Sequence, residues 1–109
     1  MALSITTPVT TISGITLATS YARVTSIDPL FGTTVEPYFT VYASEDAFIN
    51  GSGTIQIINP SNPSTIIPQQ FNFPYNRQTD GVDTLMFCHE GIQAALMGMG
   101  INSTIEGLN

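Results

Sequence analysis

The chain has 109 residues, enough for one domain with a modest core, since a chain of this length buries about two-thirds of its unfolded surface on folding. Eight acidic residues, two arginines and no lysine give a net charge of −6, and charged residues are only 9% of the chain against about 25% in ordinary domains. Two cations are too few to hold a nucleic-acid backbone or an anionic membrane surface, so neither partner is expected. Because interface cores are poor in charge, the composition favours a subunit largely covered by neighbours; a low-lysine domain kept apart by its negative charge is the alternative.

Cysteine content and the N-terminal sequence bound the compartment and the class of protein. Cys88 is the single cysteine, so a disulfide framework and a multi-cysteine zinc site are both excluded. The first residues, MALSITTPVTT, lack the basic and apolar regions of a signal peptide, and no run of about 18 apolar residues marks a membrane span. We expect a chain made in the cytoplasm that stays soluble until it docks.

Residues 1–13 read as an extended arm. Leu3 and Ile5 alternate with polar residues before Pro8, and so short an apolar set cannot form a core of its own. The interpretation is a strand that adds to a partner, which makes Leu3 and Ile5 candidate interface residues. A free terminal tail is the alternative.

Residues 14–78 form a β-rich region by their alternation of apolar and polar residues. Strands are predicted over 15–27, 35–43, 54–58 and 66–73. The small residues on one face of the first strand would let a helix or another backbone approach closely. Ser44-Glu45-Asp46 predicts one capped helical turn that ends at Asn50-Gly51. The proline-rich segment 59–64 predicts a turn that joins the third and fourth strands in a hairpin.

The segment 79–100 is the one stretch with a sustained helical pattern. Its apolar stripe, at steps of three and four, contains Val82, Leu85, Met86, His89, Ile92, Leu96 and Met99. Gly98 and Gly100 supply a stop. Residues 101–109 then form a terminal strand or tail. The expected fold is α+β: a small antiparallel sheet or sandwich of four to six strands with one C-terminal amphipathic helix, over 82–99, packed on it.

The opposite side of that helix is also apolar, and several of its residues are small: Phe87, Cys88, Gly91, Ala95 and Gly98. A helix apolar on two sides is expected to touch its own sheet and a neighbouring subunit together. Phe87, Gly91 and Ala95 are therefore candidate interface residues, and bulky replacements at Gly91 or Ala95 should impair assembly more than folding.

No catalytic or metal-binding constellation is found. Cys88 and His89 are adjacent on a helix and point about 100° apart, which is poor geometry for a nucleophile and its base, so we predict no enzymatic activity. The acidic residues show no calcium-loop pattern, and neither a cofactor nor a small-molecule substrate is expected. Arg77 precedes Asp80 and Asp83, which predicts a structural ion pair at the helix entry.

Six strand and loop aromatics offer a different kind of site: Tyr21, Tyr38, Tyr42, Phe71, Phe73 and Tyr75. Together they could form a sugar-binding platform, although aromatic residues on strands ordinarily pack in cores or interfaces.

Three segments give the chain a resemblance to the small virion structural proteins of tailed bacteriophages. They are the start MALSITTPVTTISGITL, the strand end TSYARV, and the sequence PYNRQTDGVDTL that leads into the helix. The resemblance implies a non-enzymatic virion subunit, self-associating and bound to other virion proteins, in the tail, baseplate or fibre-attachment region. A capsid decoration (cement) protein is the first alternative, and a glycan-binding or host-adhesion module is the second.

Overall fold

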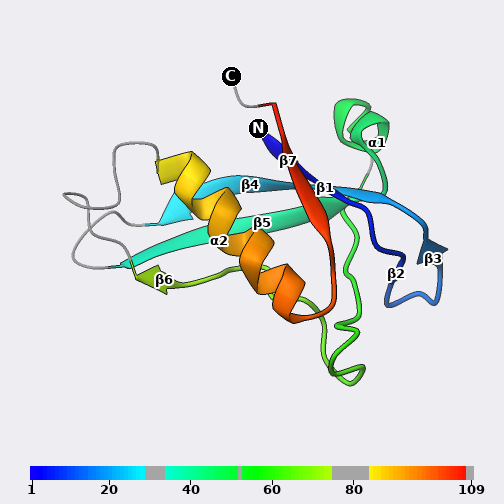
Figure 1. Cartoon of the computed structure of the whole chain (residues 1–109). Coiled ribbons are helices and arrows are strands. Elements are labelled where there is room, and N and C mark those ends of the chain that lie inside the picture. Colours follow the sequence, from blue (N-terminus) through cyan, green and yellow to red (C-terminus); the bar gives the residue numbers. More distant parts are fainter. Residues whose placement is uncertain (29–33, 52, 75–83, 108–109) are drawn as a thin grey trace.

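Antiparallel strands and one long helix make up the protein, which we describe from a computed structural model over residues 1–28, 34–51, 53–74 and 84–107 (Figure 1). The elements in chain order are β1 (Ala2–Ile5), β2 (Val9–Thr10), β3 (Thr16–Leu17), β4 (Ser20–Asp28), β5 (Thr34–Tyr42), α1 (Glu45–Ile49), β6 (Phe73–Pro74), α2 (Thr84–Gly98) and β7 (Ser103–Glu106). Five strands form one sheet in the order β6-β5-β4-β1-β7, and β2 pairs with β3 in a small second sheet. The predicted α+β class with an antiparallel sheet is confirmed.

The N-terminal segment begins with a central strand, so the interpretation of residues 1–13 as one extended docking arm is wrong. β1 pairs antiparallel with β4 on one side and with β7 on the other. Leu3 and Ile5 are fully buried in the core of their own chain and are not available to a second molecule in this fold. The alternation of Leu3 and Ile5 indicated a strand, but only the pairing on both edges shows that the strand belongs to the chain's own sheet.

The predicted strand 15–27 is interrupted, and it carries a β-bulge. β3 and β4 are separate, because β3 pairs with β2 in the small sheet while β4 runs through the main one. Within β4, Val24 pairs with Phe39 and Ser26 with Tyr38, so Thr25 is an extra residue in the ladder. The bulge shifts the alternation by one position, and Val24 and Ile27 both pack on the core side.

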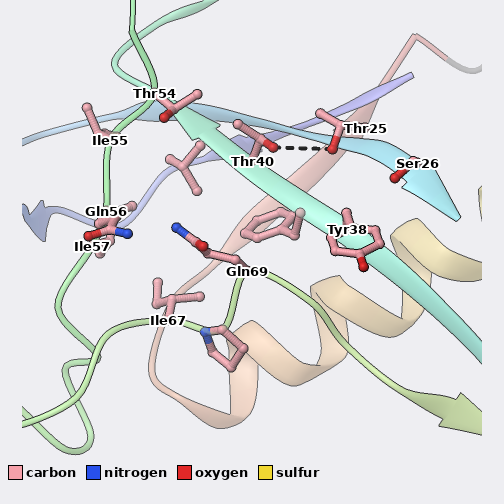
Figure 2. Close-up of a pocket in the computed structure, with 13 residues that line it drawn as sticks. Thr25, Ser26, Tyr38, Thr40, Thr54, Ile55, Gln56, Ile57, Ile67 and Gln69 are labelled. Carbon is pink, nitrogen blue, oxygen red and sulfur yellow. Dashed lines mark hydrogen bonds between the residues drawn. The ribbon is translucent and has the colours of Figure 1, made fainter. Parts of the chain in front are cut away.

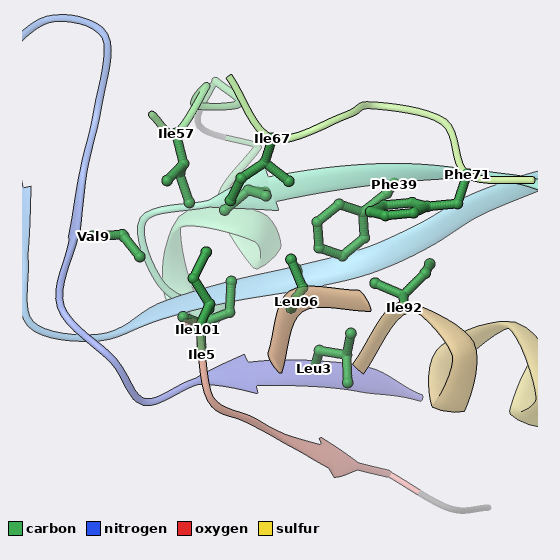
Figure 3. Packing of buried hydrophobic residues seen from close by; sticks show 12 residues of the cluster. Leu3, Ile5, Val9, Phe39, Ile57, Ile67, Phe71, Ile92, Leu96 and Ile101 are labelled. Atoms are coloured by element: carbon green, nitrogen blue, oxygen red, sulfur yellow. The ribbon is translucent and has the colours of Figure 1, made fainter. Parts of the chain in front are cut away.

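A curled layer of strands, one helix and irregular chain encloses the main core (Figure 3). The helix contributes Ile92 and Leu96, while Ile57, Ile67 and Phe71 come from segments joined to the sheet by single bridges. The predicted sandwich of two facing sheets is therefore only partly right, since the covering layer is α2 and irregular chain. The predicted hairpin between 54–58 and 66–73 survives as the bridge between Ile58 and Ile66, with further backbone hydrogen bonds beside it.

The helix α2 begins its described course at Thr84 and ends in a well-formed C-cap. Gly100 has φ +87°, its N–H donates to the Met97 carbonyl, and the Ile101 N–H donates to the Leu96 carbonyl at 2.9 Å. These two bonds define a Schellman motif, and both Leu96 and Ile101 are buried in the main core. The predicted stop at Gly100 is confirmed. β7 follows the helix, so the helix is not the last element of the fold.

The buried face of α2 is rotated from the predicted stripe. Cys88, His89, Ile92 and Leu96 are buried, whereas Leu85 is 40% exposed. The pattern predicts Cys88 on the opposite side of the helix, but Cys88 packs against Val35. The stripe residue Val82 lies outside the described residues.

The three helix residues predicted to contact a neighbour all contact the chain's own interior. Phe87 packs against the pair of Val35 and Cys88, and Ala95 packs on the main core. A Cβ on Gly91 would lie 3.0 Å from the Phe73 ring. The expectation that bulky groups at Gly91 or Ala95 would impair assembly more than folding therefore loses its basis, because the space they would enter belongs to the fold itself.

Candidate functional site

A pocket of about 380 Å³ lies beside β5 and has the character of a binding site (Figure 2). It opens where two irregular segments leave the edge of that strand. One segment is held by the Ile55 N–H, which donates to the Val41 carbonyl at 2.8 Å; the other is held by the Phe39 N–H, which donates to the Gln69 carbonyl at 2.7 Å. We call it the β5-edge pocket; its volume is within the ordinary range for small-molecule sites.

Uncharged polar side chains supply the hydrogen-bonding groups of the β5-edge pocket. They are Thr25, Ser26, Tyr38, Thr40, Thr54, Gln56 and Gln69. Apolar contact is offered by Phe39, Val41, Ile55, Ile57, Ile67 and Pro68. No Asp, Glu, Lys, Arg or His lines the pocket, so within the described part of the chain it presents hydroxyl and amide groups beside apolar surface, without a charged group.

The bulge in β4 determines how Thr25 and Ser26 line this pocket. Thr25 and Ser26 are consecutive, and both are exposed, because the extra residue lets the chain keep Val24 and Ile27 on the core side. The Thr25 hydroxyl lies 3.3 Å from the Thr40 hydroxyl on the neighbouring strand. Bulges commonly re-aim side chains at sheet edges and sites, and here the bulge places an additional hydroxyl at the pocket.

The adjacent residues Cys88 and His89 are core residues. Both are buried, and desolvation raises the pKa of the Cys88 thiol from 9.0 to about 11. His89 Nδ1 lies 2.8 Å from the Leu85 carbonyl oxygen, and because a carbonyl can only accept, Nδ1 carries the proton and donates. A thiol with a raised pKa lacks the thiolate character that nucleophilic cysteines need.

The remaining sequence-based expectations concern an ion pair, metal binding and membrane spans. Arg77, Asp80 and Asp83 lie outside the described residues, so the proposed ion pair stays a prediction. Over the ranges that the structure describes, no group of three or more His, Cys, Asp or Glu residues could hold a metal ion. The helices in those ranges include none with the length and apolar character to cross a bilayer.

The six aromatics do not form one platform. Phe71 and Phe73 stack with ring centroids 5.8 Å apart on the core side of the fold. Tyr21 and Tyr42 both contact Phe48 of α1, and the Arg23 guanidinium lies 4.4 Å from the centre of the same ring. Tyr38 alone lines the β5-edge pocket, and Tyr75 lies outside the described residues.

A second notable surface is the tip of the β2–β3 hairpin. Ile12 and Ile15 are each 59% exposed there. The turn is tightly built around Thr11: its hydroxyl accepts the Ile15 N–H at 3.2 Å, and its carbonyl accepts the Gly14 N–H at 2.9 Å. Gly14 has φ +89°, a conformation that favours glycine. Two large apolar side chains are thus presented to solvent on an ordered turn.

Sequence reasoning missed the β5-edge pocket. Thr25, Thr40, Gln56 and Gln69 carry no pattern that sets them apart, because hydroxyl and amide residues occur throughout this chain. The pocket exists through a bulge and two irregular segments, which are tertiary features.

Comparisons with protein-family models, with curated proteins and with solved structures found no match for this chain.

Proposed function

We propose that the protein is a non-enzymatic structural subunit of a tailed-bacteriophage virion, in the tail, baseplate or fibre-attachment region. The resemblance in sequence and the low charge support this proposal, and the observation that carries it is the ordered hairpin tip with Ile12 and Ile15 exposed. An apolar pair held on a stiff turn is suited to docking, because little conformational entropy is lost when it is buried by a partner. Its partners are other virion proteins and further copies of itself.

The hairpin replaces the N-terminal arm as the proposed docking element. It lies close to the segment 54–58, since the Ile12 N–H donates to the Gln56 carbonyl at 3.1 Å and the Ile58 N–H donates to the Thr10 carbonyl at 2.9 Å. These bonds anchor the tip to the main body. The Ile55 N–H in turn donates to the Val41 carbonyl of β5, so backbone hydrogen bonds join the hairpin through this segment to the main sheet.

The same proposal covers the two-sheet sandwich and the location of the subunit in the particle. A sandwich could be completed if a neighbouring subunit laid strands over an exposed face of the sheet. β7 ends the main sheet within the described part of the chain, and edge strands of this kind can pair with a second chain. Capsid decoration is the nearest alternative location, and it needs the same docking surface.

The test compares two doubly substituted proteins for incorporation into particles of the virus that encodes the chain. Ile12→Ser with Ile15→Ser should abolish incorporation while the isolated protein keeps its unfolding midpoint. Ile49→Ser with Met97→Ser is the matched control, because these side chains are 66% and 60% exposed but lie elsewhere. Normal incorporation of the hairpin variant would refute the docking element.

Mass spectrometry of purified particles tests the function itself. Absence of the protein from intact particles would refute the virion assignment. Where it is present, a copy number that matches the tail symmetry supports a tail position, and one that matches the capsid lattice supports the decoration alternative.

A further inference from the structure

We propose that the β5-edge pocket binds an uncharged saccharide unit. This inference does not depend on the virion proposal, because it rests on the pocket alone. Three observations support it. Several polar side chains of the lining have no hydrogen bond within the described protein, and the backbone that carries them is held by hydrogen bonds. The described lining residues also carry no charge.

Polar side chains in the pocket are available to a ligand. Among the residues that the structure describes, the side chains of Ser26, Thr54, Gln56 and Gln69 make no hydrogen bond within the protein. Each amide offers two donors and an acceptor, and each hydroxyl offers a donor and an acceptor. A sugar ring carries adjacent hydroxyls that both donate and accept, so it matches this mixed set better than an anion or a cation does.

The backbone beneath these side chains is held in place from both sides. The Gln69 carbonyl accepts from β5, and the Gln56 carbonyl accepts the Ile12 N–H from the hairpin. The glutamine backbones are therefore fixed while their side chains project beside the pocket (Figure 2). A pre-organised set of donors and acceptors lowers the entropy lost on binding. This matters for a small polar ligand, because its few contacts give only a modest binding free energy.

Apolar surface completes the match. Tyr38 is 38% exposed at the pocket, and the side chains of Ile55 and Pro68 lie nearby in its lining. The C–H face of a sugar ring is apolar, and the ring of a tyrosine offers a matching apolar surface. The described residues of the lining include no cation, and the net charge is −6, so sialic and uronic acids are disfavoured relative to neutral sugars.

The experiment is an NMR titration of the whole chain with neutral methyl glycosides of glucose, galactose and mannose, up to tens of millimolar. Backbone amide shifts should concentrate at Thr40, Thr54 and Gln69 for at least one sugar. Methyl glucuronide, which differs from methyl glucoside chiefly by its carboxylate, should bind more weakly. Shifts confined to other parts of the chain, or no shift with any of the sugars, would overturn the proposal.

Two neighbouring glutamines supply a matched pair of variants. Gln69→Ala removes an amide that lines the pocket and leaves the carbonyl that accepts from Phe39, so affinity should fall about tenfold, equal to about 1.4 kcal/mol. Gln70→Ala is the control, since Gln70 is also exposed and does not line the pocket. Both variants should unfold at the midpoint of the parent chain. Equal affinities in the two variants would show that the sugar binds elsewhere.

Discussion

Leu3→Ala distinguishes a central strand from a docking arm by a single stability measurement. The side chain is fully buried and belongs to the same cluster as Ile92 and Leu96 of α2. The substitution removes three carbon groups, worth about 2.4 kcal/mol at about 0.8 kcal/mol each, and a residual cavity adds to this loss. We therefore expect the free energy of unfolding to fall by about 3–4 kcal/mol, a large share of the roughly 5–15 kcal/mol that stabilises a typical domain.

Urea and thermal denaturation followed by circular dichroism measure this effect. The midpoint temperature should fall by about 12–16 °C, using about 4 °C per kcal/mol for a domain of this size. Ile12→Ala is the control, because its side chain is 59% exposed and its replacement should change stability by no more than about 0.5 kcal/mol. If Leu3→Ala and Ile12→Ala unfolded at the same midpoint, the placement of β1 inside the sheet would be wrong. Deletion of residues 1–13 should accordingly leave an unfolded chain, since it removes the strand between β4 and β7.

Three further predictions follow from individual contacts. Gly98→Ala should stabilise the chain by about 0.5 kcal/mol, because alanine favours the helix and nothing lies within 4 Å of the added Cβ. Gly91→Leu should destabilise the chain by about 1–3 kcal/mol, because the new side chain collides with the Phe73 ring. Equal unfolding midpoints for the two variants would contradict both expectations. Deleting Thr25 should leave a folded protein with a regular β4, because Val24 and Ile27 then face the core without a bulge. Loss of amide protection along the β4–β5 ladder in hydrogen exchange would disprove this expectation. The Cys88 thiol stays protonated in the fold to about pH 11 but ionises near pH 9 in the unfolded chain, so the free energy of unfolding should decrease as pH rises from about 9 to 11. Cys88→Ala should lack this decrease. An identical pH profile in both proteins would refute the burial of the thiol as its cause.

Local sequence signals predicted much of the secondary structure. Ser44 caps α1 as expected, with its hydroxyl accepting the Ala47 N–H at 3.0 Å, and Gly100 ends α2. Phe39 and Val41 share the buried face of β5, as their spacing indicated. These features depend on hydrogen bonds and side-chain periods within a few residues, so the local sequence specifies them.

The tertiary structure decided what those elements do. Leu3 and Ile5 have the same alternation in a docking arm and in a central strand, and only pairing with residues near 22 and 105 separates the two. The rotation of the α2 face follows from where Val35 meets Cys88, and the β5-edge pocket follows from an extra residue at Thr25 opposite an irregular edge. Each of these depends on contacts between residues far apart in the chain, whose partners no local period specifies.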